Sequence, residues 1–285
     1  MNPVVSKRWL LARLYEPDLV IADCRFDLAN PLAGRQAYAA SRIPGARYFD
    51  LEADLSAPVE QHGGRHPLPS PEALIATFSQ AGISTDTRVV AYDDQGGAMA
   101  TRLWWLLHYM GHDRVYVLDG GLAGWKQEGF PIEEGNPAVV IPARFEGNPQ
   151  PEWLASMPEV QAAAAQALAG EQTETVLLDS REHKRFLGEE EPIDPVAGHI
   201  PGALHYFWKD NLNERGQWRS VQELEDRFHA LPKDREIIVY CGSGVTACPN
   251  VLALKQAGFE RVRLYAGSWS DWISCPGNPI ATGEE

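Results

Sequence analysis

The first half of this 285-residue chain is repeated in its second half. Three segments recur in the same order, each with a similar pattern of apolar and turn-forming residues. The paired segments are 19–25 with 175–181, 41–50 with 198–207, and 88–125 with 236–272. Three matching blocks in one order are typical of a duplicated unit. We therefore expect two homologous domains, at residues 1–140 and 150–285.

The stretch between the two halves has the composition of an extended linker. Residues 133–151 contain four of the 21 prolines, together with Gly-Asn and Asn-Pro turn signals. The alanine-rich stretch 152–169 follows and predicts a helix that opens the second domain.

Each copy alternates short apolar runs with segments of helical period. The β-branched runs 89–92 and 237–240 indicate buried parallel strands, and segments 101–110 and 250–258 indicate helices. Repeats of strand, loop, helix and strand predict right-handed βαβ units. The expected fold class is α/β, with tandem domains that are each an open, mostly parallel sheet flanked by helices. Sites in such sheets lie beyond the carboxyl ends of the strands.

Charge and hydropathy exclude several classes of protein. Lys and Arg number 25 against 39 Asp and Glu, which gives a net charge of −14 at pH 7. Nucleic acids and anionic membranes attract clustered Lys and Arg, so neither is expected as the main partner. No apolar run approaches the roughly 20 residues that span a bilayer. Residues 1–10 lack a secretory pattern, and we expect a cytoplasmic protein.

The four cysteines predict neither a zinc site nor a disulfide framework. They form no Cys-x-x-Cys pair, and a chain of this length without a secretory signal seldom relies on disulfides. We expect free thiols, no bound metal and no organic cofactor. The cysteines are Cys24, Cys241, Cys248 and Cys275.

Cys241 follows the run 237–240 and begins the sequence Cys-Gly-Ser-Gly-Val-Thr. Glycines let successive N–H groups turn inward as an anion-binding nest, and the start of the next helix adds partial positive charge. A free cysteine is most often a small buried apolar residue. This loop instead favours a reactive thiolate, the nucleophilic form. The first copy has Asp93 at the equivalent position, so we expect it to be inactive.

These features together resemble the two-domain rhodanese-like sulfurtransferases. The resemblance rests on the Asp-for-Cys first copy, the paired Ile-Pro-Gly segments, and Gly-Gly-Leu-Ala-Gly-Trp at 120–125 against Gly-Ser-Trp-Ser-Asp-Trp at 267–272. The loop 241–247 resembles the 3-mercaptopyruvate sulfurtransferase branch, because thiosulfate-specific members tend to carry Cys-Arg-Lys-Gly-Val-Thr. A neutral loop offers a dianion such as thiosulfate less help than an Arg-Lys pair does.

The resemblance implies a covalent mechanism. The Cys241 thiolate attacks the donor sulfur, pyruvate leaves as its enolate, and a persulfide remains on Cys241. A thiol, either small or on a thioredoxin-like protein, or cyanide then accepts the outer sulfur. The loop backbone would stabilise the charged sulfur, which assigns substrate binding to Gly242, Gly244, Val245 and Thr246.

The resemblance also implies a Ser–His–acid relay that handles the thiol proton. Its serine matches Ser243, two residues after the cysteine. Its histidine matches His66, with His62 as a nearby competitor, and its acid matches Glu52 in Phe-Asp-Leu-Glu. If so, the site lies between the domains. As residues taken alone, His66 and Glu52 would be assigned to an exposed loop and a solvated surface.

A carboxylate of the donor is expected to meet arginine, whose planar fork suits bidentate binding. The family pattern Asp-x-Arg-x-x-x-Arg-Phe places this residue at Arg185, although a surface arginine is the alternative. Arg181 has a counterpart, Arg25, in the first copy, which favours a structural role for both.

One position departs from the mercaptopyruvate branch. Its second substrate arginine, nine residues after the first, corresponds to Asp194 here. An aspartate would repel the substrate carboxylate, and the loss of one charged partner costs roughly 1.5–3 kcal/mol. Arg215 or Arg219 would be the substitute cation. Thiosulfate therefore stays open as an alternative donor.

Two further alternatives are weaker. A cysteine phosphatase of the related fold requires an arginine six residues after the cysteine, where this chain has Ala247. A non-enzymatic persulfide carrier would not need the relay residues, all of which have matches here.

Overall fold

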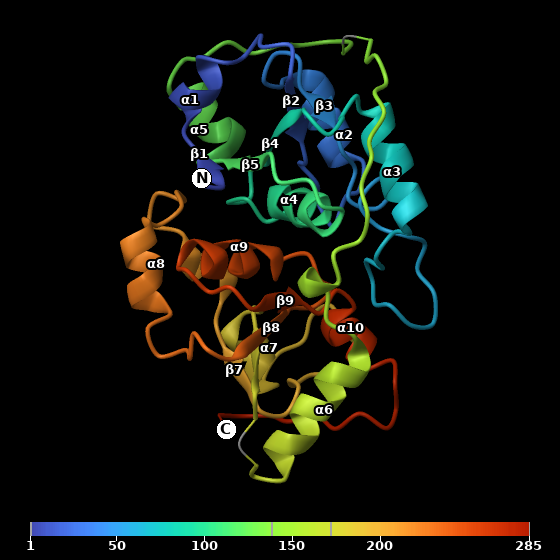
Figure 1. Ribbon diagram of the computed structural model, residues 1–285, viewed down its shortest axis with the longest axis vertical. Coiled ribbons are helices and arrows are strands. Elements are labelled where there is room, and N and C mark those ends of the chain that lie inside the picture. Colours follow the sequence, from blue (N-terminus) through green and yellow to red (C-terminus); the bar gives the residue numbers. More distant parts are fainter. Residues whose placement is uncertain (1, 138, 172, 285) are drawn as a thin grey trace. The chain divides into compact units, whose positions relative to one another are not determined.

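The computed structural model describes residues 2–137, 139–171 and 173–284, and it divides into two compact units (Figure 1). Unit 1 consists of residues 1–57, 69–150 and 212–218, and unit 2 of residues 58–68, 151–211 and 219–285. Two short segments thus pack with the half of the chain to which they do not belong in sequence. One of them, 58–68, contains His66.

Unit 1 is built on a five-stranded sheet in which every strand pairing is parallel. In sheet order its strands are β1 (Val4–Val5), β5 (Val115–Leu118), β4 (Arg88–Tyr92), β2 (Leu19–Asp23) and β3 (Arg47–Tyr48). Its helices are α1 (Lys7–Leu11), α2 (Ala33–Ala40), α3 (Pro71–Gln80), α4 (Ala100–Tyr109) and α5 (Gly121–Gln127). β4 is nearly all buried, because its β-branched residues are covered on both faces.

Unit 2 has a four-stranded parallel sheet. In sheet order its strands are β7 (Ala203–His205), β6 (Thr175–Asp179), β8 (Glu236–Tyr240) and β9 (Val262–Leu264). Its helices are α6 (Met157–Leu168), α7 (His183–Leu187), α8 (Val221–Arg227), α9 (Cys248–Gln256) and α10 (Ser268–Trp272), with short 3-10 turns at Pro151–Trp153 and Trp208–Asn211. The predicted α/β fold, with two similar parallel sheets flanked by helices, is confirmed.

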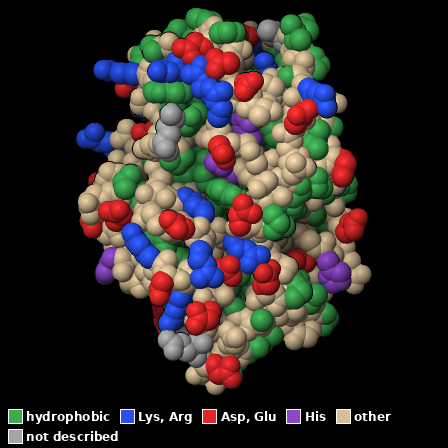
Figure 2. Space-filling model, in the orientation of Figure 1, with side chains coloured by type: hydrophobic (Ala, Val, Ile, Leu, Met, Phe, Trp, Pro, Cys, Tyr) green, Lys and Arg blue, Asp and Glu red, His purple; other side chains and the backbone are tan. Residues whose placement is uncertain are grey.

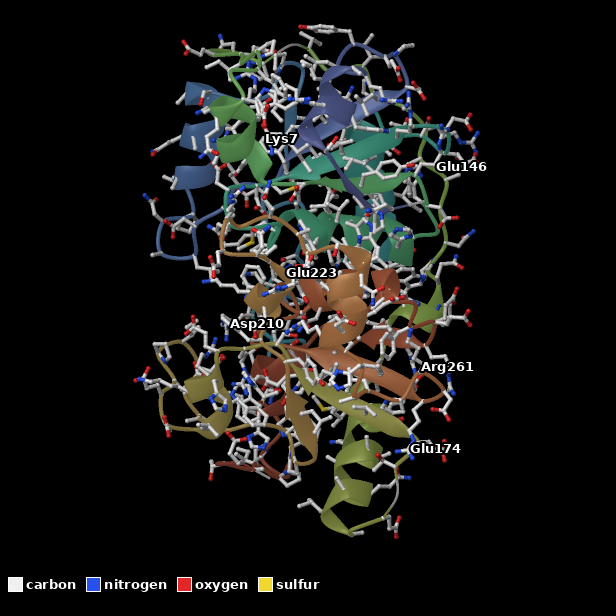
Figure 3. The ribbon with its side chains drawn as sticks, turned by 90° about the vertical axis from the view of Figure 1, so that its left-hand side faces the viewer. Lys7, Glu146, Glu174, Asp210, Glu223 and Arg261 are labelled. Carbon is white, nitrogen blue, oxygen red and sulfur yellow. The ribbon has the colours of Figure 1, made fainter. Side chains whose placement is uncertain are left out.

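The helix limits follow local capping chemistry. The helix expected over 152–169 begins only at Met157, because Ser156 forms a capping box with Glu159. α8 begins in the same way, since Glu223 (labelled in Figure 3) accepts the Ser220 N–H at 2.8 Å. At the other end, Gly258 adopts φ +83° just beyond α9, the left-handed conformation that ends a helix.

A buried carboxylate organises each unit at the carboxyl end of its central strands. In unit 1, Asp23 accepts two hydrogen bonds from Arg25 Nε and one at 2.6 Å from Arg25 Nη2. The same carboxylate accepts the Tyr92 hydroxyl at 2.6 Å. Arg25 also donates to Ser41 O at 2.7 Å, and the Tyr92 hydroxyl accepts the Ile43 N–H at 3.3 Å. Strands β2 and β4 are thereby tied to the Ile-Pro-Gly segment.

Unit 2 repeats this network. Asp179 accepts Arg181 Nη2 at 2.6 Å, and Arg181 also donates to Gly198 O at 2.6 Å. The Tyr240 hydroxyl accepts the Ile200 N–H at 3.1 Å. Burial, together with the charge of Asp179, raises the pKa of Tyr240 well above its ordinary value, so the phenol stays neutral. The structure agrees with a structural role for Arg181.

The surface mixes charges of both signs. On the face shown in Figure 2, Lys and Arg side chains lie next to Asp and Glu side chains. One such exposed pair joins Arg144 to Glu146 at 2.9 Å. Among the described residues, no helix combines the length and the apolar character that crossing a membrane requires.

We expect the Asp179→Ala substitution to lower the free energy of unfolding by about 3–5 kcal/mol, because it removes the carboxylate closest to the buried Arg181 guanidinium and leaves only the longer contact with Glu191 to balance its charge. Chemical denaturation would measure the loss. The matched control is Arg144→Ala, which removes an exposed pair and should cost under about 1 kcal/mol. Equal effects of the two substitutions would contradict the role given to the buried network.

Candidate active site

Cys241 stands at the point where β8 ends and the chain turns toward α9. Its side chain is buried, with 1% of the residue exposed. The turn depends on Gly244, which has φ +76°, and a Cβ at this glycine would lie 2.1 Å from Ala266 O. The equivalent Gly96 in unit 1 has φ +72°. Both units therefore make the same turn after their central strand.

Unit 1 shows what this turn can bind. The carboxylate of Asp93, at the position of Cys241, accepts four backbone N–H groups of its own loop at 2.8–3.0 Å. The donors are Gln95, Gly97, Met99 and Ala100. Burial raises the pKa of Asp93 and outweighs these four N–H groups, which lower it, so the net shift is upward. The loop is a nest for an anionic group at the end of the strand.

The register with unit 1 gives the positions in unit 2 that are equivalent to these donors. Ser243, Val245 and Ala247 occupy the positions of three of the four N–H groups that hold Asp93. Sequence reasoning named Val245 but assigned Ser243 to the relay alone and did not select Ala247. It also named Gly242, Gly244 and Thr246, whose role in binding stays a prediction.

The backbone of Cys241 is held by residues that sequence reasoning missed. Its N–H donates to Ser268 Oγ at 3.1 Å, and its carbonyl accepts the Trp269 N–H at 3.0 Å. Ser268 has φ +57°, the one positive φ among the non-glycine residues that the structure describes. Gly121, its counterpart in unit 1, has φ +52°. The strained serine thus supplies a hydroxyl that a glycine at this position would lack.

Two residues of the predicted relay lie in contact. His66 Nδ1 and Ser243 Oγ are 2.8 Å apart, and both side chains are buried. The competitor His62 is exposed and contacts Ser274 Oγ at 2.8 Å, so it is not the partner of Ser243. Glu52 belongs to unit 1, where it is exposed in a turn. Its place in the relay stays a prediction.

The segment that carries His66 is fastened to α10 and the residues before it. The Gly63 N–H donates to Asp271 Oδ1 at 2.7 Å, and the Arg65 N–H donates to Ser270 Oγ at 3.1 Å. A Cβ on Gly64 would lie 2.4 Å from Gly267 O, which shows how closely the two backbones approach.

Two guanidinium groups converge beside the cysteine. Arg185 on α7 and Arg65 each place an Nη2 atom within 3.4 Å of the point where a Cβ on Gly242 would stand. Asp194 forms ion pairs with both arginines, at 3.1 Å to Arg185, and Glu191 pairs with Arg185 at 2.7 Å.

The expectation that Asp194 repels a substrate carboxylate needs correction. Its side chain is only 2% exposed and lies between Arg65 and Arg185, which neutralise it. The suggested substitute cations are elsewhere. Arg219 donates to Asp210 O at 2.8 Å, and Arg215 is exposed in a turn of unit 1.

Glu191 stays ionised in this cluster. Burial raises the pKa of Glu191, but the hydrogen bonds from Arg185 and from the Asp194 N–H lower it by more, so the net shift is downward.

Within the described parts of the chain, no group of three or more His, Cys, Asp or Glu side chains is arranged to hold a metal ion.

The chain is similar to known proteins over nearly its whole length. The family described as the rhodanese-like domain matches residues 6–128 and 161–275. The chain is 49% identical to a probable 3-mercaptopyruvate sulfurtransferase of Pseudomonas aeruginosa, over 99% of this chain and 98% of that protein. It is 39% identical to the putative thiosulfate sulfurtransferase SseB of Mycobacterium tuberculosis, over 92% of this chain and 90% of that protein.

A solved structure shows the same likeness. The crystal structure of SseA from Escherichia coli, one of the 3-mercaptopyruvate sulfotransferases, matches with a TM-score of 0.79 and 32% identity. The match covers 95% of this chain and 100% of that one.

We expect Gly244→Ala to disturb the cysteine loop. An alanine in the left-handed backbone conformation costs about 1–2 kcal/mol, and the new Cβ would also collide with Ala266 O. The free energy of unfolding should therefore fall by more than 2 kcal/mol by this estimate. Gly170→Ala is the control, because Gly170 has φ +68° and no atom of the described residues lies within 4 Å of its Cβ position. Similar losses in both variants would show that the close approach to Ala266 has no cost.

Proposed function

This chain belongs to the rhodanese-like family and is a sulfurtransferase, and we propose that it takes its sulfur from 3-mercaptopyruvate. The observation that carries the choice of donor is the 2.8 Å contact between Ser243 Oγ and His66 Nδ1, in the loop of Cys241. A mercaptan donor brings a thiol proton that must be moved, whereas thiosulfate brings none. A buried hydroxyl–imidazole pair suits that task.

The proposed first half-reaction forms a persulfide. The Cys241 thiolate attacks the donor sulfur, so that an S–S bond forms while the C–S bond breaks. The electron pair of the C–S bond leaves on the enolate of pyruvate. Ser243 and His66 accept the thiol proton and return it to the enolate carbon, with Glu52 proposed as the acid behind them on the family resemblance alone.

The loop backbone has the role of stabilising the sulfur anion. N–H groups aimed at one point favour the thiolate before the attack and the persulfide anion after it. The four N–H groups on Asp93 in unit 1 support this role. We assign it to the loop that contains Gly242, Gly244, Val245 and Thr246.

The second half-reaction passes the outer sulfur to an acceptor. A thiol, either small or on a thioredoxin-like protein, or cyanide attacks that sulfur and releases Cys241 as the thiolate. The four cysteines are free thiols, which a reducing compartment maintains. This state supports the cytoplasm as the proposed location.

We retain residues 1–140 and 150–285 as the proposed domains.

Arg185 is proposed to bind the donor carboxylate. Its guanidinium lies beside Gly242, the residue after Cys241, and is anchored by Glu191 and Asp194. Two arginines face two carboxylates in this cluster, so its formal charge is balanced. A balanced cluster suits a donor with one carboxylate better than a dianion.

Thiosulfate remains the second candidate donor. The named activity of the Mycobacterium tuberculosis relative favours it. So does the presence of two guanidinium groups beside a loop that is itself neutral.

Steady-state kinetics with cyanide as acceptor should give a higher kcat/KM for 3-mercaptopyruvate than for thiosulfate. The reason is the balanced charge beside Cys241, which leaves no net attraction for a dianion. Each donor serves as the control for the other in the same assay. A preference for thiosulfate would reverse the assignment of the donor.

Cys241→Ser should abolish turnover while leaving the fold intact, because a serine hydroxyl cannot carry the transferred sulfur. Mass spectrometry of the wild-type chain after incubation with donor should show about 32 Da added at Cys241. Cys248→Ser is the control, since Cys248 is also buried but lies within α9. An adduct on Cys248 alone would refute the assigned nucleophile.

Arg185→Ala should raise the KM for 3-mercaptopyruvate about tenfold or more, since the loss of one charge-assisted partner costs roughly 1.5–3 kcal/mol. Lys184→Ala is the matched control, because Lys184 is the exposed neighbour on the same helix. An unchanged KM in the Arg185 variant would show that another group holds the carboxylate.

A further inference from the structure

We infer that Arg65 is a second specificity-determining residue, which binds the donor carboxylate together with Arg185; the inference rests on the proposed function. It begins from the surroundings of Gly242. Arg65 Nη2 lies 3.0 Å from the position of a Cβ on this glycine, and Arg185 Nη2 and Nη1 lie 3.4 and 3.7 Å from it. Both guanidinium groups thus border the residue next to the nucleophile.

Each guanidinium retains a nitrogen that can bind a ligand. Arg65 uses Nη1 for Asp194, and Arg185 uses Nε and Nη2 for Glu191 and Asp194. Arg65 Nη2 and Arg185 Nη1 make no hydrogen bond within the described parts of the chain. Arg65 Nη2 lies 3.0 Å and Arg185 Nη1 lies 3.7 Å from the Cβ position of Gly242, so a carboxylate placed there would meet a donor from each arginine.

Asp194 acts as the positioning residue for this pair. Its Oδ1 accepts Arg65 and its Oδ2 accepts Arg185 at 3.1 Å, so one carboxylate holds both side chains. Without it, two like charges would repel each other at the same point. Its burial keeps these bonds from competition with water.

The pair explains how the chain functions with an aspartate where the mercaptopyruvate branch carries arginine. In this chain the cation stands at position 65 and the anion at position 194. The carboxylate-binding nitrogens are still contributed by two guanidinium groups. Arg65 also directly precedes His66, so one short segment supplies both a carboxylate donor and the proton relay.

Gly242 has a matching role. Any side chain there would begin 3.0 Å from Arg65 Nη2 and would occupy the space in front of both guanidinium groups. The absence of a side chain leaves that space for a ligand carboxylate.

The test measures KM and kcat for wild type and Arg65→Gln with two donors: 3-mercaptopyruvate, and mercaptoacetone, which has the same thiol and ketone but no carboxylate. We expect Arg65→Gln to raise the KM for 3-mercaptopyruvate about tenfold or more with little change in kcat. The kcat/KM for mercaptoacetone should stay within about twofold of wild type, since no carboxylate contact is lost. A residue that only holds the fold would affect both donors alike.

A charge exchange guards against a variant that merely misfolds. Arg65→Asp alone should raise the KM more than Arg65→Gln does, because it adds a negative charge. Adding Asp194→Arg should lower that KM again, since the cation and the anion then trade places.

Three results would overturn the inference. The first is an unchanged KM for 3-mercaptopyruvate in Arg65→Gln, and the second is an equal fall in kcat/KM with both donors. The third is a KM in the exchange variant that exceeds the KM of Arg65→Asp. Each of these would leave the proposed function standing. If wild type itself failed to turn over 3-mercaptopyruvate, the proposed function would fall along with it.

Discussion

The buried carboxylate at the end of each central strand pair is the constraint on which the rest of the architecture depends. Asp179 and Arg181 are both withdrawn from water, so each requires the other. The arginine reaches on to Gly198 O, and Tyr240 reaches Ile200. The strand ends and the Ile-Pro-Gly segment are fixed together, and the loop after β8 starts from that fixed point.

The two units show one scaffold in two chemical states. In both, the chain leaves the central strand, turns at a left-handed glycine and enters a helix. In unit 1 the N–H groups of this turn are occupied by Asp93. In unit 2 the equivalent position is a thiol, which can form and release a covalent bond. At this position the two turns carry different side chains, a carboxylate in unit 1 and a thiol in unit 2.

The repeated units and the cysteine loop were predictable from the sequence, because they depend on local patterns of residues. The repeat predicted two similar α/β units, and the glycines around Cys241 predicted a nest. The family resemblance selected Ser243 and His66, which lie in contact 177 positions apart. The limits of α6 differed because a side-chain cap at Ser156, rather than composition, decides where a helix begins.

What could not be predicted depends on contacts between distant segments. From the sequence alone, Asp194 is expected to repel a substrate carboxylate. In the structure it pairs with Arg65, which lies 129 positions away in the sequence. The positive φ of Ser268 could not be predicted, because glycine is the residue that signals this conformation and the sequence has serine there. Composition indicates the kind of loop. Ion pairs between residues distant in the sequence decide which charges are left to act on a ligand.

The hydrogen bonding of Asp93 has a consequence for any substitution at its position. Its carboxylate satisfies four backbone donors that would otherwise be left unbonded in a buried turn. Replacing Asp93 with cysteine would remove all four of these bonds at once. The aspartate therefore stabilises the turn that it occupies, and any side chain without two acceptor oxygens would leave backbone donors of unit 1 unbonded.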